Sequence, residues 1–287
     1  MTTHGTLLRG KPLAHELNRS LAARVQRDAQ NGPRPPCLCT VLVGDDPPSA
    51  LYVRAKQRAA KQAGLFTQHH QLPADTAQKT LLCLIHRLNA DDAVDGILVQ
   101  LPLPDHINTQ TVLRAVDPAK DVDGFHPLNV GLLHAGTPRF IPCTPRACLF
   151  LLHHARVPLA GARAVVVGRS AIVGQPMARL LLGEHATVTV CHSRTTDLAA
   201  VTAEADVIIA AAGRPHLLGR EHVKPGATVI DVGTRRDAAG KLRGDVDTDA
   251  VLPVVHAITP VPGGVGPLTI AMLLENTYIA RRGMPAK

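Results

Sequence analysis

Short apolar runs alternate along the chain with longer segments in which apolar residues recur every three or four positions. The short runs predict strands, and the periodic segments predict helices. In the first part of the chain, this alternation follows an N-terminal strand and favours a parallel sheet covered by helices. Strands are expected at 37–44 and 66–73, and the segment 94–104 is expected to be a buried strand that runs into a Pro-rich loop. Helices are expected at 11–30, 49–65 and 77–91.

The helix expected at 49–65 carries a signal at each end. Ser49 is the expected N-cap, because its hydroxyl can accept a hydrogen bond from a backbone N–H of the first turn. Gly64 is expected just beyond the last turn, where glycine adopts the left-handed conformation without steric cost.

The alternation resumes after the segment 117–145, which is rich in Gly and Pro and has little periodicity. We expect this segment to be a long loop, and such loops are usually functional or mark a boundary. Beyond it, helices are expected at 146–157 and 266–283, a loop and helix at 168–185, and strands at 162–168, 186–193, 205–213, 226–234 and 257–259.

Two α/β domains account for these elements, and 287 residues are enough to give each a core. We expect an N-terminal α/β catalytic domain over 1–120, joined by the C-terminal helix 266–287. A Rossmann-type dinucleotide-binding domain is expected over 146–262, with 121–145 as the connecting region. The ligand-binding cleft is expected between the two domains.

Composition narrows the class of protein. Hydrophobic residues make up 45% of the chain but aromatic residues only 2%, so the core is built from Ala, Val, Leu and Ile, as buried parallel strands require. No apolar run is long enough for a membrane-spanning helix, and the N-terminus lacks the features of a signal peptide. We therefore expect a cytoplasmic protein that does not bind membranes.

The six cysteines form no C-x-x-C pair, so we expect reduced, mostly buried thiols and no metal site. The formal net charge of +8 has three explanations: a nucleic-acid partner, an anionic substrate or cofactor, or a basic surface without a function. Scattered basic residues and few aromatic residues speak against nucleic acid, because base stacking needs aromatic side chains. Charge alone does not decide between the other two.

A glycine turn predicts a nucleotide site. Gly168, Ser170 and Gly174 lie between a strand and a helix, and Pro176 lies in the first helical turn. Glycines let the backbone approach a pyrophosphate, and the helix N-terminus supplies free amides. The pattern G-x-S-x-x-x-G departs from the strict dinucleotide motif, and its place after a strand is what supports the assignment.

The end of the next strand predicts the cofactor. An NAD site has an acidic residue there to bind the ribose 2′-hydroxyl, whereas this strand runs into Ser193 and Arg194. A hydroxyl and a guanidinium suit a 2′-phosphate, and Arg169 could reach the same group. We predict NADP rather than NAD; the alternative is that Arg194 is an ordinary surface charge.

Tyr52 and Lys56 lie one helical turn apart. The Y-x-x-x-K pair of short-chain dehydrogenases follows the nucleotide turn, but this pair precedes it, so that assignment fails. Lys56 could instead be an acid/base group with Gln100 as a neutral partner and a carboxylate from Asp121 or Asp123 nearby. Each has a simpler explanation: an ordinary amphipathic helix, a strand cap, and a turn.

Eight motifs, in order along residues 41–277, carry a resemblance to a known family. The chain resembles the bifunctional methylenetetrahydrofolate dehydrogenase/cyclohydrolase (FolD) family, and the order of the motifs makes the match specific. The motifs read SALYVRAK, DGILVQLPLP, KDVDGFHP, CTP, VVVGRSAIVGQPMA, CHSRT, DVG and TPVPGGVGPLTIAMLLENT.

The resemblance implies two reactions in one-carbon metabolism and purine biosynthesis. The first oxidises 5,10-methylene-tetrahydrofolate with NADP to the 5,10-methenyl cation, and the second hydrolyses that cation to 10-formyl-tetrahydrofolate. It implies that Lys56 is the general acid/base, that Gln100 positions it, and that Tyr52 packs on the pterin and p-aminobenzoate portion. Asp123 would bind the pterin ring, with Asp121 the less favoured alternative.

The resemblance also implies the remaining binding residues. The folate site would be lined by Val99, Leu101, Pro262, Gly263, Gly264, Val265, Gly266 and Pro267, and the cofactor site by Gly168, Arg169, Ser170, Gly174, Ser193, Arg194 and Thr234. The stretch from Thr234 to Arg236 departs from the family pattern, which often has an apolar residue after DVG.

Two rival functions stay open: a dehydrogenase without cyclohydrolase activity, and a non-catalytic NADP- or folate-binding regulator. Lys56 and Gln100 together argue against the first, and the added presence of Tyr52 and Asp123 argues against the second. A homodimer through the apolar surface of the Rossmann-type domain is also expected from the resemblance. Basic residues near the site are expected to attract the polyglutamate tail of folates.

Overall fold

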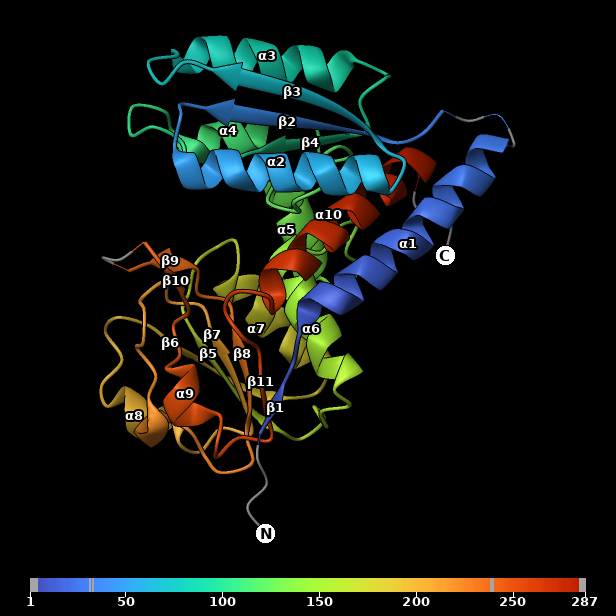
Figure 1. Cartoon of the computed structure of the whole chain (residues 1–287). Helices are drawn as coiled ribbons and strands as arrows, with labels where there is room; N and C mark the ends of the chain where they lie inside the picture. Colours follow the sequence, from blue (N-terminus) through green and yellow to red (C-terminus); the bar gives the residue numbers. More distant parts are fainter. Residues whose placement is uncertain (1–4, 31, 33, 238–239, 284–287) are drawn as a thin grey trace. The chain divides into compact units, whose positions relative to one another are not determined.

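The computed structural model describes residues 5–30, 32, 34–237 and 240–283 (Figure 1). Its contacts divide the chain into two compact units. We call residues 15–141 and 270–287 the small-sheet unit, and residues 1–14 and 142–269 the large-sheet unit. Each unit contains a parallel sheet with helices, so the expected two-domain α/β fold is confirmed. The expected domain bounds stay predictions.

The small sheet has three parallel strands in the order β3-β2-β4. They are β2 (Cys37–Val43), β3 (Phe66–Leu72) and β4 (Gly96–Val99). As expected for 94–104, a buried strand runs into a Pro-rich loop, and β4 ends at Val99. Beyond Gln100, whose N–H still bonds the carbonyl of Val41 at 2.8 Å, two prolines without N–H groups cannot continue the ladder.

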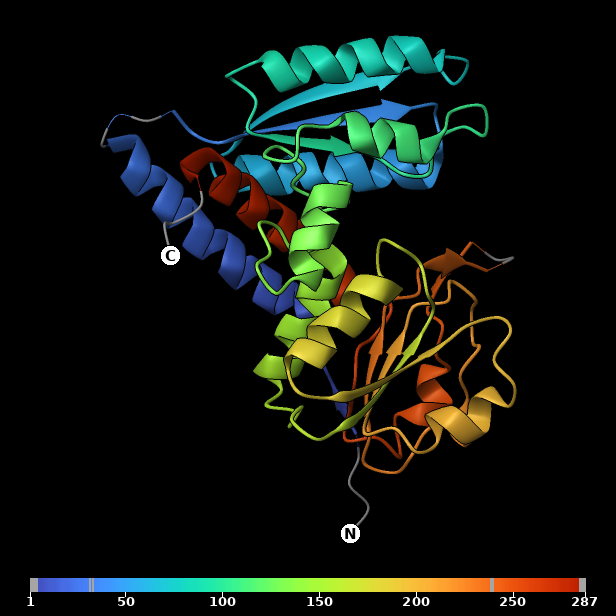
Figure 2. The same cartoon turned by 180° about the vertical axis from the view of Figure 1, so that it is seen from behind.

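Helices cover both faces of this sheet. α3 (Gln78–Ala90) and α4 (Thr109–Ala115) lie over one face, as Figure 2 shows from behind. Their buried residues pack with the odd-numbered positions of β2 and β4 in one apolar cluster. α2 (Pro47–Gln62) packs against β2 and β3 from the other face (Figure 1). α4 was not expected from the sequence.

The segment 117–145 is not one long loop, and that expectation is wrong. It contains α5 (Pro127–His134), which starts at a proline whose missing N–H costs nothing in the first turn. The His126 ring nitrogen Nδ1 accepts the N–H of Leu128 at 3.1 Å and caps the helix. A helix of two turns is too short for its periodicity to stand out in a Gly- and Pro-rich segment.

Two long helices lie near the ends of the described chain: α1 (Gly10–Gln30), which follows the strand β1 (Thr6–Leu7), and α10 (Val265–Arg282). Both were expected within a residue or so of these bounds. Each contributes residues to both units. Residues 270–282, the larger part of α10, therefore belong to the small-sheet unit, although they lie far from the rest of that unit in the sequence.

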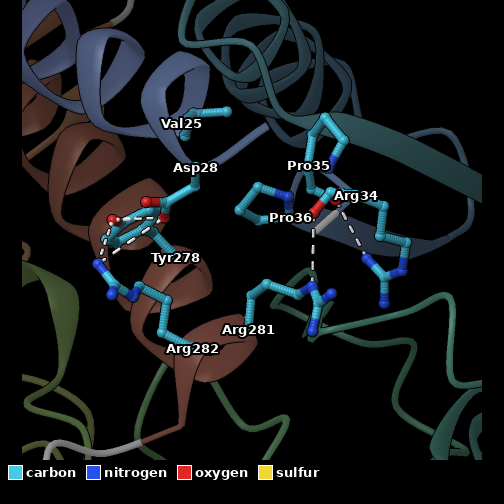
Figure 3. A pocket seen from close by; sticks show the side chains of 8 residues that line it. All are labelled: Val25, Asp28, Arg34, Pro35, Pro36, Tyr278, Arg281 and Arg282. Atoms are coloured by element: carbon cyan, nitrogen blue, oxygen red, sulfur yellow. Dashed lines mark hydrogen bonds and ion pairs between the residues drawn. The ribbon is translucent and has the colours of Figure 1, made fainter. Parts of the chain in front are cut away.

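A polar network joins α1 and α10 within the small-sheet unit (Figure 3). The hydroxyl of the buried Tyr278 donates to Asp28 at 2.8 Å, and the Arg24 guanidinium lies 4.8 Å from the centre of the Tyr278 ring. The two terminal guanidinium nitrogens of Arg24 also donate to the two carboxylate oxygens of Glu275. Beside this network lies a cavity of about 360 Å³ lined by Val25, Asp28, Arg34, Pro35, Pro36, Tyr278, Arg281 and Arg282.

The large sheet has six parallel strands in the order β1-β11-β8-β7-β5-β6. Successive strands β5, β6 and β7 place β6 on one side of β5 and β7 on the other, so the chain reverses direction across the sheet between β5 and β7. In open α/β sheets, ligands bind at the carboxyl ends of the strands at such a switch point. The strands are β1 (Thr6–Leu7), β5 (Arg163–Val167), β6 (Thr187–Cys191), β7 (Val207–Ala210), β8 (Thr228–Asp231) and β11 (Ala257–Ile258).

Helices and a short 3₁₀ turn accompany this sheet. One face is covered by an apolar cluster that draws on the segments of α8, η1 and α9, while α7 packs on β5 and β6 and also against α6. A small antiparallel hairpin of β9 and β10 was not expected from the sequence. The elements are α6 (Cys143–His154), α7 (Gly174–Gly183), α8 (Leu198–Thr202), β9 (Arg235–Arg236), β10 (Leu242–Arg243), η1 (Arg220–His222) and α9 (Thr248–Val251).

All six cysteines lie in the described residues and are free thiols, and all except Cys83 are buried, as expected. Burial raises the pKa of the Cys39 thiol to about 12 and raises the pKa of Cys37, Cys148 and Cys191. Within the described ranges, each helix is too short or too polar to cross a bilayer.

Candidate active site

Helix α2 positions Tyr52 and Lys56. Its N-cap is Asp46 rather than Ser49, which corrects the sequence-based expectation: the Asp46 carboxylate accepts the N–H of Ser49 at 2.9 Å. Hydrogen bonding to the Ser49 side chain, and then to its backbone N–H, lowers the pKa of Asp46. The helix ends as expected at Gly64 (φ +77°), where the N–H groups of Gly64 and Leu65 bond carbonyls of the last turn.

The side chains of Lys56 and Gln100 meet within the small-sheet unit. Lys56 Nζ lies 3.0 Å from Gln100 Oε1, and the Lys56 residue is only 9% exposed. The Gln100 amide nitrogen donates to the carbonyl of Leu101 at 2.7 Å, so the amide oxygen must face the lysine. The amine is therefore held by a neutral acceptor at the carboxyl end of β4.

The residues around this pair present both apolar and polar groups. Tyr52 lies one turn before Lys56 on α2 and is 37% exposed. Val99, the last residue of β4, is buried, whereas Leu101 is half-buried. An exposed aromatic ring one turn away from a buried amine suits a planar ligand that stacks on the ring.

Asp121 orders the loop that runs alongside β4. Its carboxylate accepts the N–H groups of Phe125 and His126 at 3.2 and 2.8 Å and the side-chain amide of Asn129 at 2.7 Å. Burial raises the pKa of Asp121 to about 7, although these donors favour the ionised form. Asp121 thus has a structural use, while Asp123, two residues further on, is half-buried.

The glycine turn of the large-sheet unit is compact. Gly168 has φ +130°, and a Cβ placed there would lie 2.2 Å from the carbonyl oxygen of Ala211. A Cβ on Gly174 would lie 2.1 Å from the carbonyl oxygen of Gly168. The Ser170 hydroxyl accepts the N–H groups of Val173 and Gly174 at 3.2 and 3.3 Å. This cradle at the start of α7 leaves backbone accessible to a phosphate.

The loop after β6 exposes Ser193 and Arg194, while Arg169 is exposed at the glycine turn. The N–H of Arg194 is bonded to His192 Nδ1 at 3.2 Å, and the N–H of His192 to Thr195 Oγ1 at 2.9 Å. These bonds fix the backbone of the loop and leave the hydroxyl and guanidinium side chains at its surface. The donor set fits a phosphate monoester.

The remaining candidates lie in the large-sheet unit as well. Thr234 is exposed just after β8. The stretch 262–266 contains the loop before α10 and the first two residues of that helix. The carbonyl of Gly263 accepts the N–H groups of Gly10 and Lys11 at 2.9 and 3.2 Å. A Cβ on Gly264 would lie 2.7 Å from the carbonyl oxygen of Pro260, so this loop needs glycine there.

Two family models match the chain. The catalytic domain of tetrahydrofolate dehydrogenase/cyclohydrolase matches residues 8–123, and its NAD(P)-binding domain matches residues 142–283. The chain belongs to the tetrahydrofolate dehydrogenase/cyclohydrolase family. The resemblance seen in the sequence motifs is therefore confirmed.

Relatives in this family align over almost the whole chain. Bifunctional protein FolD from Acidiphilium cryptum is 58% identical over 271 residues (94% of this chain, 96% of the relative), and FolD 2 from Paracoccus denitrificans is 55% identical over 280 residues (96% and 92%). The crystal structure of FolD from Campylobacter jejuni matches with a TM-score of 0.94 at 48% identity, covering 96% of this chain and 98% of that one. A Trypanosoma brucei family member complexed with NADP cofactor and inhibitor matches with a TM-score of 0.94 at 40% identity, covering 98% and 99%.

The structure brings together only part of the expected set. Lys56 bonds Gln100, with Tyr52 on the same helix and Val99 and Leu101 on either side of Gln100. The glycine turn, the loop after β6, Thr234 and the loop 262–266 belong to the other unit. The roles of all these residues in the family reaction stay predictions.

Sequence reasoning missed the carboxylates that order the loops of the large-sheet unit. Asp231 and Asp245 are each 1% exposed and accept backbone N–H groups, yet neither was expected to matter. Each acid belongs to a short Gly-containing motif of the sequence: Asp231 to DVG and Asp245 to GDVD. A buried carboxylate that binds successive amides cannot be told from a surface turn by sequence alone.

Proposed function

We propose that this chain oxidises 5,10-methylene-tetrahydrofolate with NADP to the methenyl form and hydrolyses that product to 10-formyl-tetrahydrofolate. Family membership and the names of the bifunctional relatives support this pair of reactions. The observation that carries the hydrolytic step is the buried Lys56 amine 3.0 Å from the neutral Gln100 oxygen.

Lys56 is the acid/base of hydrolysis. Its neutral amine takes a proton from water as the oxygen bonds to the bridging carbon of the methenyl cation. The ammonium then gives a proton to N5 as the bond between that carbon and N5 breaks. The adduct's hydroxyl proton leaves for solvent, so one water is consumed and one proton is released. Gln100 orients the amine through its uncharged amide oxygen.

Oxidation needs orientation more than acid/base chemistry, because loss of a hydride from the methylene carbon leaves a delocalised cation. NADP, when bound, supplies the hydride acceptor. The turn of Gly168, Ser170 and Gly174 would hold its pyrophosphate at the start of α7. Its two glycines are needed for close backbone packing, because a Cβ on either would collide with a backbone carbonyl oxygen of the protein. Arg169, Ser193 and Arg194 bind the 2′-phosphate, and Thr234 contacts the nicotinamide end.

Folate recognition uses the groups around Lys56. Tyr52 stacks on the pterin and p-aminobenzoate portion, and Asp123 pairs with the N–H edge of the pterin. Asp121 is the weaker alternative for that role, because its oxygens already accept three donors inside its own loop. Val99 and Leu101 line the site, and the stretch Pro262, Gly263, Gly264, Val265 and Gly266 stays a predicted folate-binding segment of the family.

One spectrophotometric experiment tests the function. NADPH formation from methylene-tetrahydrofolate and decay of methenyl-tetrahydrofolate are followed separately with the purified chain. Both rates are expected, and oxidation without hydrolysis would indicate a dehydrogenase alone. Binding without either reaction would indicate a regulator and would overturn the proposal.

The product, 10-formyl-tetrahydrofolate, is a formyl donor, so the enzyme serves one-carbon metabolism and purine biosynthesis in the cytoplasm. A homodimer through the large-sheet unit is supported by its edge strand β6, where Val190 is 38% exposed, and by Leu182 on α7, 58% exposed. Sedimentation at several concentrations tests it, since a monomer throughout would exclude the dimer.

The net charge of +8 supports attraction of a polyglutamate tail on the folate. The Michaelis constant for folates of increasing tail length is expected to fall, and the effect to weaken in salt because exposed charges are screened. A Michaelis constant that changes with neither tail length nor salt concentration would contradict this proposal.

A further inference from the structure

Two carboxylates are buried at the carboxyl end of the large sheet. Asp231 is the last residue of β8, and Asp245 follows β10. Each is 1% exposed. Burying a carboxylate costs free energy unless its oxygens are well bonded, so their bonding partners indicate what they do.

Asp245 binds three successive amides of the loop after β7. Its Oδ2 accepts the N–H groups of Ala212 and Gly213 at 2.6 and 2.9 Å, and its Oδ1 accepts that of Arg214 at 2.7 Å. Three consecutive N–H groups that converge on one carboxylate give the loop a single shape. The loop is thus ordered by a side chain more than thirty residues further along the chain.

Asp231 in turn holds Asp245. Its Oδ1 accepts the N–H groups of Gly233 and Asp245 at 2.8 and 2.9 Å, and its Oδ2 accepts that of Val246 at 2.9 Å. The two acids therefore form one relay of hydrogen bonds. It runs from the end of β8, through the segment after β10, to the loop after β7.

The backbone is shaped around these two carboxylates. A Cβ on Gly233 would lie 2.4 Å from Asp245 Oδ1, and a Cβ on Gly244 would lie 1.9 Å from Asp231 Oδ2. Neither approach is possible for a residue with a side chain unless the carboxylate moves. The glycine of each motif, DVG or GDVD, thus makes room for the buried acid of the other motif.

The loop that Asp245 orders borders the glycine turn. The Ala211 N–H bonds the carbonyl of Val167 at 2.8 Å. The Ala211 carbonyl oxygen lies 2.2 Å from the position that a Cβ on Gly168 would take. Gly168 opens the turn at the switch point between β5 and β7. A shift of the loop after β7 would therefore change the wall of the proposed dinucleotide site.

We propose that Asp245, itself held by Asp231, is a positioning residue for NADP, because it fixes the loop after β7 against the glycine turn. The inference rests on the proposed function, since it concerns the cofactor of the same reaction. Asp245 does not touch the cofactor in this role. Asp245 instead fixes the backbone of the loop after β7, which borders the proposed cofactor site.

The test compares Asp245→Asn with Asp247→Asn. Asparagine at 245 keeps the shape, but its NH₂ group faces an amide donor, so at least one N–H of the loop loses its acceptor. Asp247 lies two residues away and caps α9 by accepting the N–H of Ala250 at 3.2 Å, a task that asparagine performs equally well. The pair makes the same chemical change in one segment, with and without the relay.

Three quantities are measured for each full-length variant: NADPH affinity from the fluorescence of NADPH, which the Trp-free chain does not obscure, the steady-state constants of oxidation, and the rate of methenyl hydrolysis. Asp245→Asn is expected to weaken NADPH binding and raise KM for NADP about tenfold or more. Its kcat at saturating NADP and its hydrolysis rate are expected to stay within about threefold of the wild type. Asp247→Asn is expected to match the wild type throughout.

Unchanged NADPH affinity in Asp245→Asn would overturn the inference, and so would an equal fall in hydrolysis, which would indicate a general loss of structure. If Asp245→Asn does not fold, Asp231→Asn is measured in the same way. Failure of both to fold would assign the pair to folding alone and also overturn the inference. A wild-type chain that binds no NADPH would instead refute the proposed function, so the two failures are distinct.

Discussion

The two candidate regions of this enzyme are built in opposite ways. In the small-sheet unit, the proposed chemistry depends on two side chains: the Lys56 amine on a regular helix and the Gln100 amide at a strand end, 3.0 Å apart. In the large-sheet unit, it depends on the absence of side chains, because Gly168 and Gly174 keep backbone close to backbone. We therefore expect the first region to lose function when side-chain atoms are removed. We expect the second to lose function when a side chain is added to one of its glycines.

This difference gives each region its own assay. Hydrolysis of the methenyl compound needs no cofactor, so it reports on the region of Lys56. Oxidation needs NADP as well, so a defect confined to oxidation reports on the glycine turn. The predictions below use this separation, from the largest expected effect to the smallest.

The largest effect is expected for Lys56→Met. It removes the acid/base group and keeps the apolar stem, so hydrolysis should fall by about 10²–10⁴-fold, the usual contribution of such a group. Oxidation should fall much less or be spared. Lys61→Met, an exposed position on the same helix, is the matched control and should leave both rates unchanged. Full retention of hydrolysis by Lys56→Met would remove the proposed role.

Gly168→Ala should raise KM for NADP about 100-fold, because a displaced turn costs several hydrogen bonds to the cofactor. Its Cβ meets the Ala211 carbonyl oxygen at 2.2 Å. Hydrolysis should be unchanged. Gly161→Ala is the control: Gly161 also has positive φ (+76°), but its Cβ would have no atom within 4 Å among the described residues. If both variants behaved alike, backbone strain rather than collision would be the cause.

Arg194→Gln should raise KM for NADP by about 10- to 100-fold, the value of a charge-assisted contact with phosphate. KM for NAD should not change, because NAD lacks the 2′-phosphate, so it serves as the internal control. Steady-state rates with each cofactor measure the effect. A wild-type preference for NAD would contradict the assignment at once.

The smallest effect concerns pH and the loop of Asp121. The pKa of Asp121 is raised to about 7 in the folded chain, above the value of about 3.9 for an unfolded Asp. The folded state therefore binds more protons between these values, and the free energy of unfolding should fall as pH rises from about 4 to 7. The wild type should lose about 1–2 kcal/mol more than Asp121→Asn over this range.

Urea unfolding at pH 5 and pH 8, followed by loss of hydrolysis, measures this difference for the small-sheet unit. The pKa of Asp231 is also raised to about 7 by burial, but both proteins contain Asp231, so its contribution cancels in the comparison. Equal pH dependence in the two proteins would show that Asp121 stays ionised in the fold.

Much of this fold could be predicted because strands and long helices differ in period. The strands at the centre of each sheet and helices α1, α2, α3 and α10 follow from the spacing of apolar residues. The two-turn helix α5 and the two-residue strands β9 and β10 are too short to show a period. The N-cap of α2 was misplaced because Asp46 and Ser49 are equally good caps, and only the following prolines favour the earlier start.

The candidate site also has a part that the sequence predicts and a part that it does not. The sequence predicts the pairing of Lys56 with Gln100, which lie 3.0 Å apart, because family motifs carry that information across 44 residues. The tasks of Asp121, Asp231 and Asp245 could not be foreseen. Each depends on which backbone amides point inward once distant loops have closed, and a sequence pattern does not record the direction of an N–H group.

The single exposed thiol has a practical consequence. Cys83 lies on α3, and the chain's five other cysteines are buried, with raised pKa values for four of them that suppress the reactive thiolate. A maleimide dye should therefore attach at one defined place on the natural chain, with no cysteine removed by mutation. A label attached at Cys83 would therefore allow single-molecule or spin-label measurements of the enzyme's motions during turnover.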